Sequence, residues 1–237
     1  MLASGGLTNL FTVLSADQII LGLVVACGLM VVEERRLSLA ALLAQYLLLG
    51  LLVGPELYRP IVLVRIGLGV AVCLVLSITA WHVERVLRHQ AASAALPSVW
   101  PGSPVPMEHT DTQAAVAHAS PTRSMGTLFR CMVLLLAILV AYGLWRTYPL
   151  AMIPAAVGLT SYLLVTTGLL VTLTSADPLR MGLGILTFIN GFEGAYLFLE
   201  NSLVMLALLI VVDIIMALGI VACAEMWLAA REGETAL

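Results

Sequence analysis

Long, uninterrupted runs of apolar residues are the dominant pattern along the chain. Seven runs, each about as long as a helix that crosses a bilayer, alternate with short segments that hold charges, prolines or glycines. Because the apolar positions are continuous rather than alternating, they favour helices over the strands of a membrane β-barrel. The pattern therefore predicts an all-α fold, a polytopic transmembrane bundle of about seven helices, at residues 16–32, 37–53, 60–82, 125–144, 150–174, 178–199 and 201–227.

The composition supports membrane insertion and excludes two other classes of protein. Of the 237 residues, 61% are hydrophobic and only 11% are charged, and the mean hydropathy is +1.06. Soluble domains carry about 25% charged residues, so this chain could not cover a water-exposed surface with polar groups. The net charge of −3, without a basic stripe, also excludes a nucleic-acid-binding surface.

One long segment, residues 89–124, interrupts the series of helices. It holds five of the ten prolines and many Ala, Ser, Thr and His residues, with neither a helical nor a strand period. We expect a flexible cytoplasmic linker here, between a membrane domain of three helices at residues 1–88 and one of four helices at 125–237. His109 and His118 in the linker could bind a metal weakly, but solvated polar residues are the better interpretation.

The sequence carries no recognisable cofactor or metal motif. Its four cysteines lie in separate apolar segments without a neighbouring histidine, so we interpret them as small apolar packing residues. Phosphate-binding loops, nucleophile elbows, paired histidines and haem motifs are absent from the sequence. We therefore expect a non-catalytic chain without cofactors.

The arginines indicate how the helices are oriented, since all eleven basic residues are arginines. If seven helices alternate in direction, only Arg59 and Arg146 fall on one side of the membrane. Eight fall on the other side: Arg35, Arg36, Arg85, Arg88, Arg123, Arg130, Arg180 and Arg231. The positive-inside rule then predicts an external N-terminus and a cytoplasmic C-terminus, in the inner (cytoplasmic) membrane of the cell.

Three ionisable residues lie inside otherwise apolar helices: Arg65, Glu193 and Asp213. A charge at mid-bilayer costs at least ~3 kcal/mol on insertion scales, so such residues are paired or functional. Measured from the turn at residues 200–201 with the helical rise, Glu193 lies about 10 Å deep and Asp213 about 18 Å, while Arg65 lies about 8 Å below the same surface. Asn190 shares a helix face with Glu193, at a depth of about 15 Å. We therefore expect Arg65 to contact Glu193, and Asn190 to lie near Asp213.

Two interpretations of these buried polar residues stay open. In the first, they form contacts that only fix the packing of the helices. In the second, two carboxylates at staggered depths with Asn190 between them form a proton relay. Burial favours the protonated form of a carboxyl group and a nearby cation favours the ionised form, so the two effects together can let such a group exchange its proton. Asp17 and Gln45 could extend this polar path, and so could Tyr46; for Gln45 and Tyr46, hydrogen bonding between helices is the simpler role.

Several short motifs resemble the hydrogenase-4 component E family, whose members are related to the small K-type membrane subunit of respiratory complex I. The match lies in residues 186–193 (Leu-Thr-Phe-Ile-Asn-Gly-Phe-Glu) and 211–217 (Val-Val-Asp-Ile-Ile-Met-Ala). Residues 36–39 (Arg-Leu-Ser-Leu) followed by Gln45 resemble the start of that family's second helix. Arg65 falls where the family tends to carry a buried lysine in its third helix.

The resemblance implies a membrane-arm subunit without cofactors, beside antiporter-like proton-pumping subunits and a redox or hydrogenase-type module. Asp213 matches the family's acid in the last helix. The family's other acid usually stands directly before the Asn-Gly pair, whereas this chain has Ile189 there and Glu193 four residues later, about one helical turn away. On this basis we expect a proton relay of Asp213, Glu193, Asn190 and Arg65.

Two functions of other classes compete with this hypothesis. One is a stand-alone proton-coupled secondary transporter, although interrupted half-helices, which many transporters use at a midplane site, are not evident in the sequence. The other is a structural membrane scaffold. Co-purification would separate a complex subunit from a transporter, and neutralisation of Asp213 would separate a relay from a scaffold.

The orientation leads to a first testable prediction. A single cysteine introduced as Ser103→Cys in a chain lacking its native cysteines should resist a membrane-impermeant thiol reagent in intact cells, because the segment at residues 89–124 faces the cytoplasm. The same cysteine should react once the cells are permeabilised. Strong labelling in intact cells would reverse the predicted orientation.

Overall fold

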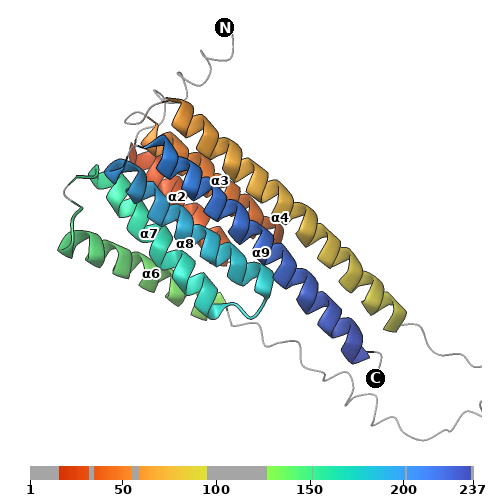
Figure 1. Ribbon diagram of the computed structural model, residues 1–237. Helices are drawn as coiled ribbons and strands as arrows, with labels where there is room; N and C mark the ends of the chain where they lie inside the picture. The colour runs from red at the N-terminus through yellow and green to blue at the C-terminus, as the bar shows by residue number, and fades with distance from the viewer. Residues whose placement is uncertain are drawn as a thin grey trace, which may run out of the picture.

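The regular structure of the chain is helical throughout the residues that the structure describes. The computed structural model describes residues 16–31, 35–54, 59–94, 127–150, 152–200 and 202–235. Within these ranges, seven helices follow one another along the chain and no strand occurs, which confirms the predicted all-α fold (Figure 1). They are α2 (Ala16–Val31), α3 (Arg35–Val53), α4 (Arg59–Ala94), α6 (Thr127–Thr147), α7 (Ala155–Thr174), α8 (Pro178–Leu199) and α9 (Leu203–Thr235).

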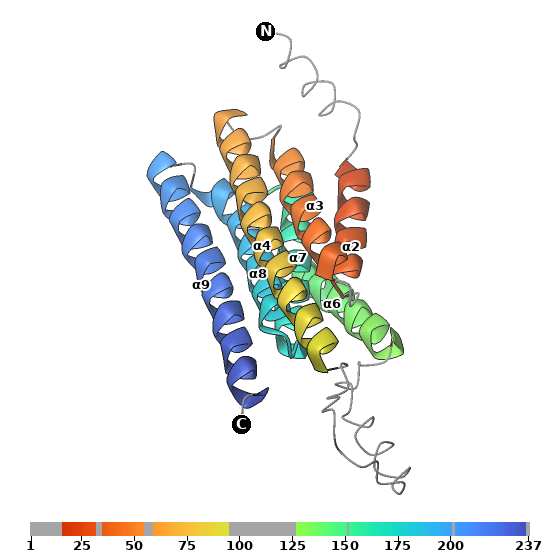
Figure 2. The ribbon, with the colours of Figure 1, turned by 90° about the vertical axis from the view of Figure 1, so that its right-hand side faces the viewer.

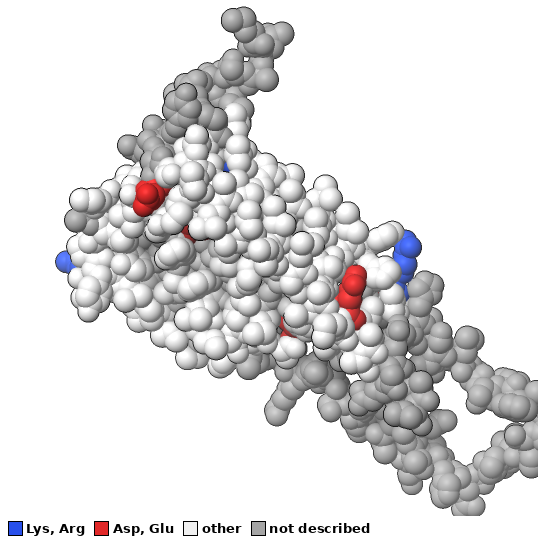
Figure 3. Space-filling view, viewed as in Figure 1, with Lys and Arg blue, Asp and Glu red and all other residues white. Residues whose placement is uncertain are grey.

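Five of the described helices are long and apolar enough to cross a membrane. The spans are Arg36–Val53, Ile61–Val86, Ala155–Thr174, Pro178–Leu199 and Leu203–Ala230. Helices α2 and α6 contain the shorter apolar stretches Asp17–Met30 and Cys131–Thr147. On the face shown in Figure 3, the charged side chains among the described residues form only a few small patches between uncharged residues.

The helices form an elongated bundle in which α6 is the most strongly tilted (Figures 1 and 2). Helix α3 packs against α2, α4 and α8, while α9 packs against α4 and α8. Figure 1 shows α4 and α9 extending beyond the other helices at the end where α9 terminates. The chain thereby brings α4, α8 and α9, which carry the three buried charges, to one side of the bundle.

Helix α4 continues to Ala94, whereas the sequence pattern predicted its end at His82. Residues 83–94 contain no proline or glycine and are rich in good helix formers, so the helix continues after the apolar run has ended. The first six residues of the segment predicted as a linker, 89–94, are therefore helical. Residues 95–124 of that segment, with His109 and His118, lie outside the described residues.

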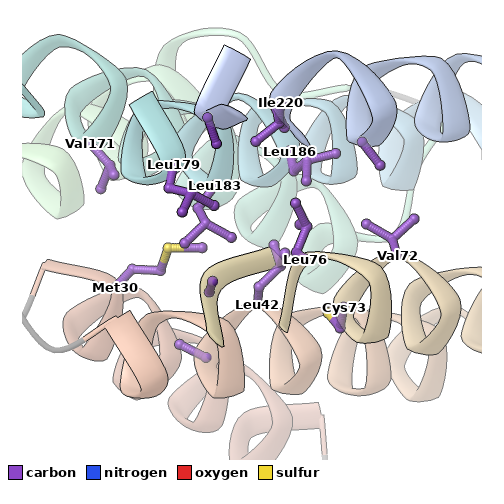
Figure 4. Packing of buried hydrophobic residues seen from close by; sticks show 14 of the residues in the cluster. Met30, Leu42, Val72, Cys73, Leu76, Val171, Leu179, Leu183, Leu186 and Ile220 are labelled. Atoms are coloured by element: carbon purple, nitrogen blue, oxygen red, sulfur yellow. The ribbon is translucent and has the colours of Figure 1, made fainter. Parts of the chain in front are cut away.

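Apolar side chains from both halves of the chain form the main core of the bundle. Figure 4 shows Met30, Leu42 and Leu76 facing Leu183, Leu186 and other side chains of the second half. A second cluster joins α2, α3, α6 and α7, and includes Leu23, Cys27 and Leu164. Cys73 belongs to the main core, so both buried cysteines lie among apolar residues, while Cys131 and Cys223 are exposed.

Helices α7 and α8 make the closest contact in the bundle because glycines stand where their backbones meet. A Cβ atom added to Gly168 would collide with the backbone of Phe188 and Gly184. One added to Gly184 would lie 2.8 Å from the backbone nitrogen of Thr172, and one added to Gly191 would lie 2.9 Å from that of Val165. Small residues at such contacts let membrane helices approach closely.

This contact leads to a prediction about stability. Gly168→Ala should lower the free energy of unfolding by about 1–3 kcal/mol, since a methyl group has to be inserted between two backbones. Gly143→Ala in α6 is the matched control, because nothing lies within 4 Å of a Cβ atom at Gly143. The free energy of unfolding of both variants can be measured in mixed micelles of mild detergent and SDS, with circular dichroism as the signal. Equal stability of the two variants would contradict the prediction.

Candidate functional site

Arg65 of α4 connects α4 to α8 inside the bundle. The residue is only 3% exposed. Its Nη1 atom lies 3.4 Å from Oε2 of Glu193, and its Nη2 atom donates hydrogen bonds to Oδ1 of Asn190 at 2.8 Å and to the Asn190 carbonyl oxygen at 3.1 Å. The predicted contact between Arg65 and Glu193 is confirmed, and both acceptors lie on one face of α8, as their spacing of three residues requires.

Asp213 of α9 is fully buried and accepts a hydrogen bond from a side chain of α3. The Tyr46 hydroxyl donates to Oδ2 of Asp213 at 3.3 Å. The Asn190 side-chain oxygen accepts a hydrogen bond from Arg65, and Asp213 accepts one from Tyr46. The expectation that Asn190 lies near Asp213 stays a prediction.

These five residues form what we call the buried ionic cluster: Arg65, Asn190, Glu193, Asp213 and Tyr46. They come from α3, α4, α8 and α9, and each is at most 3% exposed. The four relay residues predicted from the sequence thus lie in one group, and Tyr46 joins them. The sequence offered Tyr46 only as an extension of the path beside Gln45, but adjacent residues of a helix point about 100° apart and reach different neighbours.

Gln45 points away from the ionic cluster and forms a second polar group. Its Oε1 atom accepts a hydrogen bond from the Thr187 hydroxyl at 3.1 Å, and its Nε2 atom donates to Sγ of Cys27 at 3.7 Å. Thr187 precedes Asn190 by three residues, so the polar face of α8 continues from Glu193 to Thr187. The sequence analysis did not single out Thr187; its spacing from Asn190 and Glu193 was the available signal.

Asp17 does not belong to this polar path. Its side chain is exposed in the first turn of α2, a helix that packs against α3, α6 and α7. The sequence analysis offered Asp17 as an extension of the path on the basis of its depth, but depth along a helix does not fix the direction in which a side chain points. Across the described part of the chain, no three His, Cys, Asp or Glu side chains are grouped as a metal site would require.

The charges of the ionic cluster are unequal. It contains one guanidinium, which cannot lose its proton in a protein, and two carboxyl groups. An uncompensated buried charge is costly, so the cluster is electrically balanced when one of the two carboxyl groups carries a proton. Glu193 Oε1 and Asp213 Oδ1 are buried and have no hydrogen-bond partner among the described residues, so each has an oxygen on which that proton can reside.

The described arginines gather mainly at the end of the bundle where α4 and α9 terminate. Arg36 lies 3.7 Å from Glu84, and Arg180 donates to the Met30 carbonyl oxygen at 3.3 Å. Arg85 stacks over the Trp81 ring, 3.8 Å from its centroid. Arg36 is exposed in its pair with Glu84, so this pair contributes little to stability.

The fold and the ionic cluster define a helical membrane protein with an ionisable group buried between its helices. Comparison of the chain with protein-family models, with curated proteins and with solved structures finds no match. The function therefore has to be argued from the chemistry of the cluster.

The charge balance of the cluster leads to a second prediction about stability. Arg65→Met should lower the free energy of unfolding by about 3 kcal/mol, the lower end of the range for removing one partner of a buried ion pair. Adding Glu193→Gln to Arg65→Met should recover part of this loss, since one uncompensated carboxylate is then gone. Arg146→Met, at an exposed position, should have little effect.

Denaturation in mixed micelles measures all three variants. If Arg65→Met and the double variant lost the same stability, Arg65 would stabilise the bundle through packing of its side chain rather than through its charge.

Proposed function

We propose that this chain is a cofactor-free, non-catalytic membrane subunit of an energy-converting complex of the complex I-like or hydrogenase type, and that its buried ionic cluster takes part in proton translocation. The observation that carries the proposal is the burial, in one cluster, of two carboxyl groups and a single arginine, which pairs with Glu193. Intramembrane carboxylates are most often parts of ion or proton pathways. The resemblance to the hydrogenase-4 component E family supplies the type of complex.

The cluster has the features that a proton-transfer group needs. Glu193 and Asp213 lie on different helices of the cluster; Glu193 pairs with Arg65, and Asp213 accepts a hydrogen bond from Tyr46. A proton that leaves one carboxyl group can therefore be accepted by the other without changing the total charge of the cluster. Such a transfer is less costly in an apolar interior than the creation of a new charge.

The surface of α9 suits a subunit that has neighbours in the membrane. Large apolar side chains are exposed along this helix, among them Leu208, Val211, Ile215 and Leu218. In the proposed complex, antiporter-like proton-pumping subunits and lipid cover this surface, and a redox or hydrogenase-type module drives translocation. The arginine-rich end then faces the cytoplasm and the N-terminus lies outside the inner membrane.

Two steps test this proposal. Affinity purification of the full chain in mild detergent, with mass spectrometry of the proteins that accompany it, should recover antiporter-like and redox subunits. Recovery of the chain alone would favour the stand-alone transporter.

In the complex so isolated, Asp213→Asn should leave assembly intact and lower proton translocation by roughly 100-fold, within the range for a positioned proton-transfer group. Asp213→Glu should keep part of the activity, because it retains an acid at a slightly different reach. Glu225→Gln is the matched control, since Glu225 is an exposed carboxylate of the same helix. Normal translocation by an assembled Asp213→Asn complex would leave Asp213 as a packing residue of a scaffold.

A further inference from the structure

Within the proposed function, on which this inference rests, we propose that the Tyr46 hydroxyl passes the proton between Glu193 and Asp213, and that Gly69 positions Tyr46 for this task. Neither role follows from the sequence motifs. Both follow from the way in which a side chain of α3 reaches a carboxyl group of α9.

Tyr46 reaches Asp213 by crossing the surface of α4. A Cβ atom added to Gly69 of α4 would lie 2.6 Å from both Cβ and Cγ of Tyr46 and 2.8 Å from its Cδ1. Real Cβ atoms do not approach other carbons so closely, so the Tyr46 ring occupies the space that any side chain at position 69 would need. The absence of a side chain at Gly69 therefore admits the ring between α3 and α4, with its hydroxyl 3.3 Å from Asp213 Oδ2.

Gly69 also places the ring beside the remaining members of the ionic cluster. Arg65 precedes Gly69 by four residues, so the two share one face of α4. The ring therefore packs on the face of α4 from which Arg65 reaches Glu193, while its hydroxyl contacts Asp213.

A hydroxyl is the member of this group best suited to pass a proton. The guanidinium of Arg65 lies next to Glu193, but it cannot be deprotonated and so cannot relay a proton. A phenol can donate one proton and accept another at the same oxygen. Among the five cluster residues, Tyr46 is the one that can donate and accept a proton at one oxygen and that also contacts Asp213.

The transfer balances in atoms and charge. Tyr46 gives its hydroxyl proton to Oδ2 of ionised Asp213, so an O–H bond breaks on Tyr46 and one forms on Asp213. Tyr46 takes a proton from the protonated carboxyl group of Glu193, so the O–H bond on Glu193 breaks and that on Tyr46 is restored. One proton moves from α8 to α9, and Tyr46 ends as it began.

Two variants with a matched control test these roles in the isolated complex. Tyr46→Phe keeps the ring packed on Gly69 and removes the hydroxyl; it should lower proton translocation by roughly 100-fold, as expected for loss of a positioned proton-transfer group. Gly69→Ala should cause a similar loss, since its methyl group displaces the ring. Gly67→Ala, on an open part of the same helix with nothing within 4 Å of the added atom, should behave as the natural chain. Tyr46→Phe combined with Gly69→Ala should lose no more activity than Tyr46→Phe alone.

A second measurement is independent of translocation and separates the hydroxyl's contact from general packing. Infrared spectra of the full chain in phospholipid nanodiscs, recorded at acidic pH so that Asp213 is protonated, should contain a carboxylic-acid C=O stretching band that Asp213→Asn removes. That band should shift to higher frequency in Tyr46→Phe and in Gly69→Ala, because the carboxyl group loses a hydrogen bond, and should stay in place in Gly67→Ala. If Gly69→Ala does not assemble, Tyr46→Phe alone decides.

The outcomes distinguish this inference from the proposed function. If Asp213→Asn abolishes translocation and Tyr46→Phe does not, the role of Tyr46 is refuted while the proposed function stands. An unshifted Asp213 band in Tyr46→Phe refutes the contact itself. If Asp213→Asn translocates protons normally, the proposed function fails, whatever the spectra show.

Discussion

The charge of Arg65 is the constraint on which the arrangement of α4, α8 and α9 depends. A guanidinium in an apolar interior has to be compensated locally, since it can neither lose its proton nor reach water. Glu193 and Asn190 provide acceptors from α8, and Asp213 of α9 joins the cluster through Tyr46. The polar contacts of Arg65 therefore orient α4 and α8 toward each other. One carboxyl group is left in excess over the single guanidinium, and in the proposed function this excess gives the cluster a proton to exchange.

The helices that hold the cluster differ in how firmly they are packed. Helices α7 and α8 meet through glycines and bury 56% of their spans, whereas α9 buries only 22%. Asp213 is thus a fully buried polar residue on the least buried of the five membrane spans. In the proposed function, a change in the location of the proton acts on a helix whose span is the least buried of the five and which exposes large apolar side chains. Such a helix is suited to transmit the state of the cluster to another subunit.

The sequence was sufficient for the helices and for part of the cluster. Continuous apolar runs predicted all seven described helices, and the constant rise per residue placed Arg65 and Glu193 at one depth. The end of α4 was missed because hydropathy reports where a helix leaves the apolar layer, not where its hydrogen bonding stops. Asp17 was misassigned because depth does not determine direction. The Tyr46–Asp213 contact could not be predicted, since it depends on a gap at Gly69 that exists only once α3 and α4 are packed.

The composition of the cluster also bears on which ion the proposed complex would move. A hard metal cation takes about six or more oxygen ligands and brings its own positive charge. Here the guanidinium already supplies the cation, and the cluster's carboxyl oxygens that lack a hydrogen-bond partner among the described residues are Glu193 Oε1 and Asp213 Oδ1. Two oxygens beside a fixed positive charge form a poor site for a second cation. In the proposed function a proton suits this geometry, because a proton needs a single oxygen and removes the excess negative charge without a ligand shell.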